Sequence, residues 1–336
     1  MSHLRFLLLT VVLQGTAAWQ ADARTPINTP PVLAYTLSID TTDLSGYNIT
    51  IHVYHAPPRF QLAMATHHEY DDRYWRFVTA FTVQPPASFS HEDSAVWTIT
   101  TPGDEAIVTY RIHLPPPAPF RFSQRPFLTP TGGLVGDLHS FMYLVEAPHA
   151  TSVLTLLLPY EWQAATGLEP ASPTGSNEFA AQSAPQFLDA PILVGRLRRW
   201  TFTVDSIPHV VAYLPATPTL NFDTIALVEN TQKIVRAAKD IFGTFPYKHY
   251  SFLLEEGSEG ALEHRNSVTI GVSATELASD RPDIYEEIAH EFFHTWNLMD
   301  IRPSGYTDLN YGKQQQSPGL WFSEGITMLY AGLLCR

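Results

Sequence analysis

Short segments in which apolar and polar residues alternate run through the first two thirds of the chain. Residues 34–40 and 48–54 alternate with a period of two, which is the pattern of half-buried β-strands. The same pattern predicts further strands over residues 75–83, 95–100, 106–114, 152–158 and 199–204. Stretches that contain proline and glycine separate these segments, and proline cannot donate to a β-ladder. The pattern therefore predicts a β-rich domain built as a sandwich or a curved sheet.

The apolar spacing changes near residue 221. Residues 223–242 place apolar side chains at helical spacing and are followed by Gly243, a common helix stop. Two short apolar strands are predicted at residues 250–254 and 267–273, and two further helices over residues 282–299 and 319–334. The order indicates an α+β chain. We expect a β-rich amino-terminal domain over residues 24–210 and a second domain over residues 211–336.

Composition and charge narrow the class of protein. The 336 residues make two domains the prior expectation. The net charge is −13 and the one basic cluster lies at residues 196–199, so binding to nucleic acid through phosphate contacts is not expected. Cys335 is the single cysteine, which excludes an internal disulfide framework and a cysteine-based zinc finger.

Residues 1–23 have the pattern of a signal peptide. Arg5 precedes a short apolar run, and Ala21-Asp22-Ala23 fits the small-x-small rule for cleavage. The alternative is a buried strand or helix at the start of the fold. No later segment is long and apolar enough to be a membrane helix. We therefore expect a chain that is exported to the periplasm or secreted.

Residues 290–294 read His-Glu-Phe-Phe-His, an H-E-x-x-H motif on a predicted helix. His290 and His294 lie four residues apart, so both imidazoles share one helix face and can reach one metal ion. Glu291 can point toward the same site without being a ligand and could act as general base. Zinc also needs a third protein ligand and an open position for water. The motif predicts a Zn²⁺ centre, and the alternative is a helix that carries these residues by chance.

The third ligand separates the classes of zinc peptidase. The longer metzincin motif is not met, because Asn297 stands where that motif has glycine. A glutamate on a following helix is the other arrangement, and Glu324 lies 30 residues after His294 in an apolar, helix-like segment. An unpaired carboxylate in such a segment would be costly. Asp300 and Asp308 are less favoured because they lie in a polar loop, and the alternative for Glu324 is a surface residue at a helix start.

Gly260, Ala261 and Glu263 precede the strand predicted at residues 267–273. Glycine beside a strand edge lets a substrate backbone come close. A carboxylate in this place could bind the α-ammonium group of a peptide, which would make a peptidase an aminopeptidase. The alternative is a loop of solvated acids that includes Glu255, Glu256 and Glu259.

Together, these motifs resemble the glycyl aminopeptidase family, whose members are zinc gluzincins distantly similar to aminopeptidase N and thermolysin. The resemblance rests on residues 260–264, 290–297, 301–303 and 321–325, and on residues 189–192 near the end of the β-rich region. It implies a saddle-like β-domain followed by a thermolysin-like catalytic domain. It also implies that the family preference for amino-terminal Gly and Ala applies here.

The resemblance assigns roles to individual residues. It implies His290, His294 and Glu324 as the zinc ligands and Glu291 as the general base. It implies that Glu263 contacts the amino terminus of the substrate, with Gly260 and Ala261 beside the substrate backbone. The leading prediction is thus a zinc aminopeptidase that acts on peptides with a free amino terminus. A zinc endopeptidase and a non-catalytic secreted binding protein, in which the β-domain does the binding, are the alternatives.

The chain departs from the family pattern at three places. Ala261 stands where the family often has a second glycine. Met328 stands where thermolysin has an aspartate that orients a histidine, so Thr327 or another group is expected to take that part. The chain ends at Arg336, whereas family members continue with a helical region and usually a PDZ domain. That region would be expected to supply a tyrosine that stabilises the oxyanion, so an incomplete catalytic domain is expected.

Overall fold

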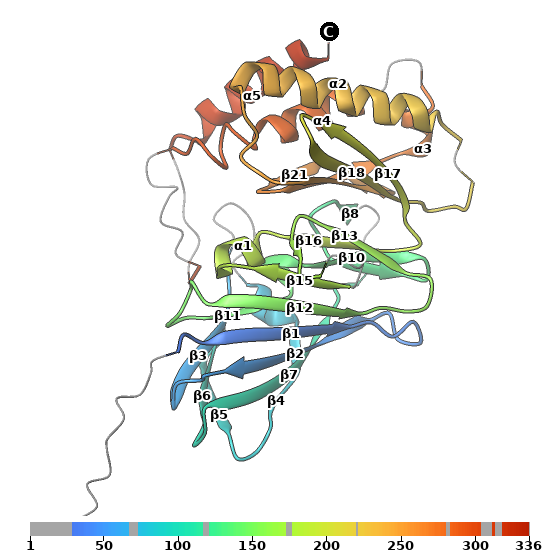
Figure 1. Cartoon of the computed structure of the whole chain (residues 1–336). Coiled ribbons are helices and arrows are strands. Elements are labelled where there is room, and N and C mark those ends of the chain that lie inside the picture. Colours follow the sequence, from blue (N-terminus) through green and yellow to red (C-terminus); the bar gives the residue numbers. More distant parts are fainter. Residues whose placement is uncertain are drawn as a thin grey trace, which may run out of the picture. The chain divides into compact units, whose positions relative to one another are not determined.

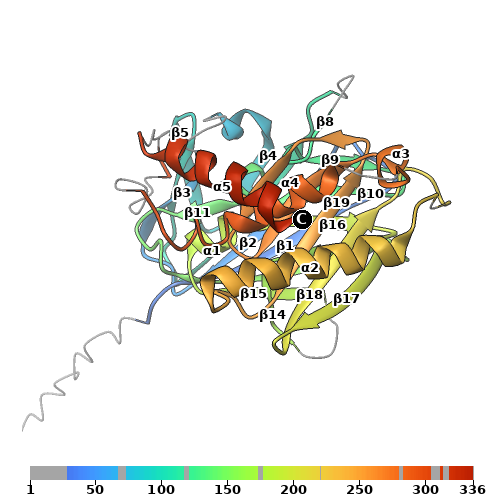
Figure 2. The same ribbon diagram turned by 90° about the horizontal axis from the view of Figure 1, so that it is seen from above.

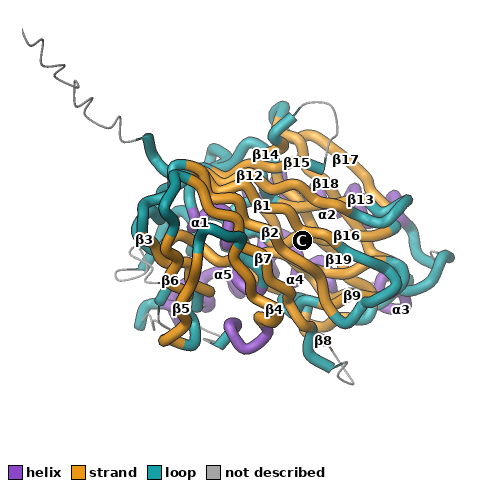
Figure 3. The backbone as a smooth tube through the Cα atoms, turned by 90° about the horizontal axis from the view of Figure 1, so that it is seen from below, coloured by secondary structure: helices purple, strands orange, loops and turns teal. Residues whose placement is uncertain are grey.

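Strands dominate the chain from residue 32 to residue 214 (Figure 1). The computed structural model describes residues 29–66, 73–116, 121–172, 177–219, 221–279, 283–303, 311–312 and 318–335. Within these residues the largest sheet has seven strands in the order β14-β15-β12-β1-β2-β7-β4, which Figure 3 shows side by side. Its strands are β1 (Val32–Ser38), β2 (Gly46–Tyr54), β4 (Val78–Val83), β7 (Glu105–His113), β12 (Thr151–Leu157), β14 (Glu169–Pro170) and β15 (Glu178–Ala181).

The seven-stranded sheet buries one face because apolar side chains alternate along its strands. Leu33 and Tyr35 of β1 are buried, and so are Ile49 and Ile51 of β2. They share one core with Phe60 and other residues of a second sheet, which has the order β11-β3-β6-β5. The strands of this sheet are β3 (Arg59–Met64), β5 (Ser88–Asp93), β6 (Val96–Thr100) and β11 (Met142–Leu144). The alternation therefore gives the two-sheet packing that the sequence predicts.

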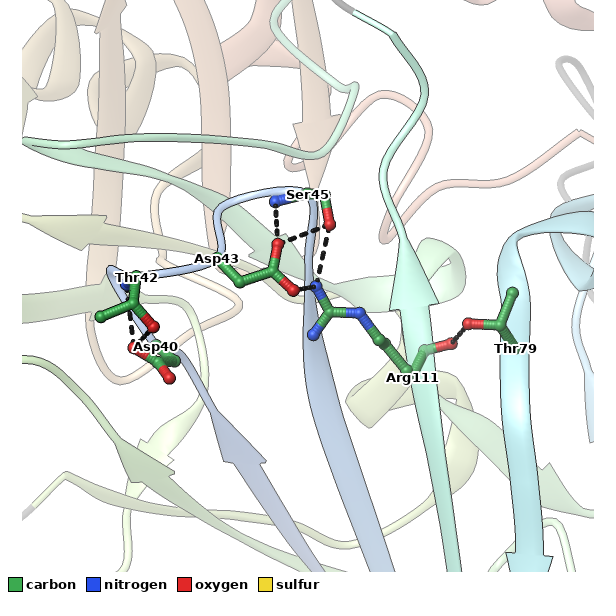
Figure 4. A network of polar contacts seen from close by, with 6 residues as sticks. All are labelled: Asp40, Thr42, Asp43, Ser45, Thr79 and Arg111. Carbon is green, nitrogen blue, oxygen red and sulfur yellow. Dashed lines mark hydrogen bonds and ion pairs between the residues drawn. The ribbon is translucent and has the colours of Figure 1, made fainter.

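Carboxylates close the turn between β1 and β2 (Figure 4). Asp40 accepts hydrogen bonds from the backbone and hydroxyl of Thr42, and Asp43 accepts the same pair from Ser45. Arg111 of β7 donates to the second oxygen of Asp43 over 2.7 Å. These local bonds hold the turn that sets the register of β1 on β2.

Two further sheets pack face to face. The order of the third sheet is β13-β16-β10-β9, and its strands are β9 (Phe127–Thr129), β10 (Gly132–Gly136), β13 (Gln163–Thr166) and β16 (Pro191–Gly195). The order of the fourth is β17-β18-β19-β22-β21, and its strands are β17 (Arg198–Val204), β18 (Ile207–Leu214), β19 (Tyr250–Glu256), β21 (Ala261–His264) and β22 (Ser267–Val272). Leu134 and Leu193 of the third sheet contact Leu214 and Leu253 of the fourth in a small core.

Helices cover the other face of the five-stranded sheet (Figures 1 and 2). Because this sheet is covered on both faces, its parallel strands β18, β19 and β22 are largely or wholly buried along their length. The covering helices are α2 (Thr224–Phe242), α4 (Ile284–Phe293) and α5 (Leu320–Leu334). The remaining elements are α1 (Ala184–Leu188), α3 (Ala274–Leu277), the 3-10 helices η1 (Tyr74–Phe77) and η2 (Asp137–His139), and the paired strands β8 (Arg121–Phe122) and β20 (Ser258–Glu259). The chain has the predicted α+β fold.

The helix predicted over residues 223–242 is confirmed as α2. Asp223 caps its first turn by accepting hydrogen bonds from two backbone N–H groups. Gly243 ends it in the left-handed conformation, at φ 82°. The last predicted helix is confirmed as α5, but one side of it is exposed. The exposed apolar residues on this helix are Trp321, Phe322, Met328, Leu329 and Leu333.

Two predicted elements differ from the structure. The strand predicted over residues 75–83 begins only at Val78, because the preceding residues form η1 and bury Tyr74. The helix predicted over residues 282–299 ends at Phe293, and its predicted first residue lies outside the described residues. Beyond Phe293 the backbone bonds of Thr295 and Trp296 span three residues instead of four, which tightens the chain into turns.

The predicted boundary between residues 210 and 211 falls inside β18. β17 pairs with β18 along its whole length, so the five-stranded sheet takes strands from both sides of that boundary. The division of the chain into two domains at this residue stays a prediction. The predicted signal peptide, residues 1–23, lies outside the described residues. Among the helices that are described, none has the length and apolar character needed to cross a membrane.

His209 makes the stability of the fold sensitive to acid. Its imidazole is buried on β18, donates to the Ile207 carbonyl and contacts the Tyr247 hydroxyl over 2.9 Å. Burial lowers the pKa of His209 from 6.5 to about 4. Between pH 6.5 and about pH 4, this histidine binds a proton in the unfolded chain but not in the folded chain. The free energy of unfolding therefore falls as the pH falls through this range.

We expect this histidine to lower the free energy of unfolding by about 2 kcal/mol between pH 7 and pH 5, at about 1.4 kcal/mol per pH unit below 6.5. Urea unfolding of the wild type and of His209→Gln at both pH values measures the difference. The variant should lose that part of the pH dependence. Equal pH dependence in both proteins would show that His209 does not cause it.

Candidate metal centre

The H-E-x-x-H motif lies on the last turn of α4. The helix packs Ile288, Ala289 and Phe292 into the core against the five-stranded sheet. His290 lies on this turn, and His294 directly follows it as the helix cap. Their ring centroids are 4.8 Å apart, as expected for side chains that are four residues apart on one face. The His294 side chain is 2% exposed and the His290 side chain 22%.

Glu324 of α5 lies beside both histidines. Its Oε2 is 3.2 Å from His290 Nε2 and 3.3 Å from His294 Nε2, and the two Nε2 atoms are 3.1 Å apart. The structure thus brings together all three residues that the resemblance implies as ligands. The Glu324 side chain is 47% exposed, so the prediction that an unpaired carboxylate would be costly at this position is wrong. What distinguishes this carboxylate is its pairing with the two histidines.

The spacing of the three ligand atoms fits a tetrahedral metal. Bonds of about 2.0–2.2 Å to a tetrahedral zinc ion place neighbouring ligand atoms about 3.3–3.5 Å apart. His294 Nδ1 lies 3.2 Å from the Asn297 carbonyl, so this nitrogen carries the proton and Nε2 presents a lone pair to the cluster. Nitrogen lone pairs and a carboxylate that converge on one point call for a cation. The donor set of two imidazoles and one carboxylate suits zinc.

Two residues hold the candidate ligands in place. Asn297 donates from Nδ2 to the Ser323 carbonyl over 2.9 Å and to Thr327 Oγ1 over 3.0 Å, which ties α4 to α5. Thr327 Oγ1 in turn lies 3.4 Å from His294 Nδ1. The sequence raises Thr327 as a group beside a ligand, but it treats Asn297 only as a break in the metzincin pattern. The side-chain bonds of Asn297 depend on the end of α4 and could not be read from the motif.

The same contacts shift the pKa values of the ligands. Burial raises the pKa of Glu324, but the hydrogen bonds and charges of His290 and His294 outweigh it and lower the value to about 2. Burial opposes protonation of His294, yet Glu324 and Glu263 outweigh it and raise its pKa. Without a metal ion, these contacts thus favour a proton on His294 beside the ionised Glu324. A metal ion bound here would replace that proton.

Glu291 lies next to the cluster and is not part of it. It is 9% exposed, and its Oε2 has no hydrogen-bond partner among the residues that the structure describes. Burial, followed by the negative charges of Glu287 and Glu324, raises the pKa of Glu291 to about 8. The hydrogen bonds of Glu291 with the backbone and side chain of Glu263 lower this pKa in turn. A buried carboxylate with one free oxygen and a raised pKa is suited to accept a proton.

Glu263 comes to the site on β21, an edge strand of the five-stranded sheet. Gly260 precedes this strand at φ 72°, a conformation that favours glycine. A Cβ atom on Gly260 would approach no closer than 3.9 Å to Phe122, so the backbone and not the space requires glycine here. Ala261 and Glu263 are both partly exposed. The structure therefore places Gly260, Ala261 and Glu263 along one edge that reaches the metal cluster.

The alternative of a loop of solvated acids is wrong for Glu255. This residue is the last fully buried position of β19, with 0% exposure. Burial raises its pKa well above the usual value, while the Ser258 hydroxyl and Arg121 lower it. Asp300, by contrast, is exposed and lies outside the metal cluster, and Asp308 lies outside the described residues.

An α+β chain with a His-His-Glu cluster and a free carboxylate beside it has the features of a metal-dependent hydrolase. The sequence matches the Peptidase M61 N-terminal domain over residues 34–196 and the M61 glycyl aminopeptidase over residues 284–336. The two matches together span more than half of the chain, in the order of the family. The chain belongs to the M61 glycyl aminopeptidase family.

Solved structures share the fold. An aminopeptidase N family protein from Idiomarina loihiensis superposes with a TM-score of 0.80 at 20% identity, over 90% of this chain and 54% of that one. A variant of an M1 zinc metallopeptidase from Deinococcus radiodurans superposes with a TM-score of 0.51 at 17% identity, over 91% of this chain and 70% of that one. The chain thus spans about half the length of the first protein. A search of curated proteins finds no significant match.

Proposed function

We propose that the chain is a zinc peptidase, or the zinc-binding part of one, that releases small amino-terminal residues such as Gly and Ala. The observation that carries the proposal is the convergence of His290, His294 and Glu324 next to the buried carboxylate of Glu291. When bound to the three ligands, zinc would polarise the scissile carbonyl and lower the pKa of a water molecule. The fold and family support this activity, and the order of the motifs along the chain agrees with it.

We assign the proton transfers to Glu291. Its free Oε2 would accept the proton that the attacking water releases, and the same oxygen would pass that proton to the leaving amine. The apolar surroundings of α4 exclude water from the far side of this carboxylate.

We assign recognition of the substrate amino terminus to Glu263. Its effects on the pKa values of Glu291 and His294 support a position of its carboxylate close to these two side chains. Several carboxylates gathered in a partly buried space favour a cationic occupant, and a peptide offers its α-ammonium group. Gly260 and Ala261, on the same edge, would lie beside the substrate backbone. The site would therefore take peptides with a free amino terminus.

The signal-peptide pattern of residues 1–23 supports export of this peptidase to the periplasm or the medium. The substrates would then be peptides outside the cytoplasm.

Hydrolysis of an alanyl anilide tests the proposal, beside the same compound with an acetylated amino group. We expect the purified chain to cleave the free amine and to leave the acetylated compound intact. Glu263→Gln should raise KM for the free amine by about tenfold or more, because a hydrogen bond to a charged group is lost. Glu259→Gln is the matched control, since Glu259 is an exposed carboxylate on the neighbouring strand. Equal cleavage of the acetylated compound would indicate an endopeptidase and would remove Glu263 from its role.

A further inference from the structure

β21 joins the proposed substrate edge to the amino-terminal sheets. Glu263 and His264 are neighbours on this strand, so their side chains point to opposite faces. The burial pattern agrees, because Glu263 is partly exposed and His264 is buried. Glu263 contacts Glu291 on the metal side of the strand. His264 therefore leaves the strand on the face away from the metal ligands.

Asp189 contacts the end of β21 with both of its carboxylate oxygens. Oδ1 lies 2.9 Å from His264 Nδ1, and Oδ2 accepts a hydrogen bond from the Arg265 backbone over 2.9 Å. Asp189 lies between α1 and β16, in the β-rich part of the chain and 75 residues away from His264 in sequence. The side chain of His264 is 7% exposed and that of Asp189 is 30% exposed, so the contact is buried on the side of the histidine. These two contacts fix both the His264 side chain and the Arg265 backbone at the point where the strand ends.

A second anchor lies before β21. β8 of the amino-terminal part pairs with β20, and the Ser123 backbone donates to the Glu259 carbonyl over 3.0 Å. Arg121 donates from Nε to Ser258 Oγ over 2.7 Å, and this hydroxyl lies 2.8 Å from the buried carboxylate of Glu255. These two hydrogen bonds partly offset the cost of burying the Glu255 carboxylate. They also hold the backbone that leads into Gly260. Residues from earlier in the chain thus hold the backbone both before and after β21.

We propose that Asp189 and Arg121 are positioning residues for substrate recognition, which hold β21 so that Glu263 reaches the amino terminus of the peptide. This inference rests on the proposed function, because it concerns the residue assigned to the substrate ammonium group. The β-rich part then has a role in specificity that goes beyond supporting the fold. Asp189 acts through the strand and does not itself touch the substrate or the metal.

The test is a double-mutant cycle between Asp189→Asn and Glu263→Gln. Asp189→Asn removes one of the two acceptors and should raise KM for the alanyl anilide by about tenfold, with kcat changed by less than about twofold. The affinity of the zinc-free chain for alaninamide, measured by calorimetry, should fall in parallel. In the Glu263→Gln background the same substitution should have no further effect, because the recognition that it supports is already lost.

Asp205→Asn is the matched control, since Asp205 pairs with Lys239 on the surface and an asparagine tolerates its φ of 48°. It should leave KM and the affinity for alaninamide unchanged. Arg121→Lys keeps the charge and loses the Nε–H donor, and it should also raise KM. This variant tests the inference if Asp189→Asn folds poorly. If Glu263→Gln raises KM while Asp189→Asn and Arg121→Lys do not, or if the effects add, the inference falls and the proposed function stands. If the wild type neither cleaves the anilide nor binds alaninamide, both fall together.

Discussion

Replacing Glu291 by glutamine is expected to lower the rate of hydrolysis by about 10²–10⁴-fold, the usual effect of removing a general base, and to leave zinc in place. The amide has the shape of the carboxylate but cannot accept the proton of the attacking water. Zinc should stay because Glu291 lies beside the cluster and is not one of its ligands. The measurement is turnover of the alanyl anilide together with the zinc content of the purified variant.

Glu286→Gln is the matched control for this substitution. Glu286 lies on the same helix with an exposed side chain, so the same chemical change there should leave turnover near the wild-type rate. Wild-type turnover in Glu291→Gln would show that another group takes the proton. Loss of zinc from Glu291→Gln would instead make this residue part of the metal centre.

Replacing Glu324 by glutamine is expected to weaken zinc binding by more than about 100-fold, the upper range for changes to groups that only orient a ligand. The substitution removes the negative charge and one of three converging donors, and leaves two histidines that bind zinc less well. Titration of the metal-free chain with zinc, in competition with a chelating dye, measures the affinity.

Thr327→Val provides the graded comparison. Thr327 lies 3.4 Å from His294 Nδ1 and is bonded to Asn297, so its loss should weaken zinc binding by about 10–100-fold. The order of affinities should be wild type, then Thr327→Val, then Glu324→Gln. A Glu324→Gln variant with wild-type affinity would exclude Glu324 as a ligand, whatever its position in the fold.

The sequence predicts those elements whose residue spacing and end signals lie within the element itself. The helical spacing of residues 223–242 and the Gly243 stop predict α2 nearly to the residue. The H-E-x-x-H spacing places His290 and His294 on one face by helix geometry alone. These predictions need no knowledge of which segments meet in space.

What the sequence cannot predict depends on contacts between distant segments. β1 pairs in parallel with β12 across more than a hundred residues, and nothing local specifies that partner. Glu255 reads as a solvated acid, but Arg121 and Ser258 allow it to be buried. Likewise, α4 ends at Phe293, before the predicted end, and just beyond it Asn297 bonds to α5, a helix that lies later in the chain. In each case a tertiary partner overrides what the local sequence indicates.

Zinc-dependent turnover of the alanyl anilide by the wild-type chain tests the central claim most directly. We expect the metal-free chain to take up one zinc ion and to cleave the free-amine compound only when loaded. A chelator should abolish cleavage, and added zinc should restore it. A chain that binds no zinc, or that cleaves at the same rate with and without it, would contradict the assignment of His290, His294 and Glu324 as a catalytic metal centre.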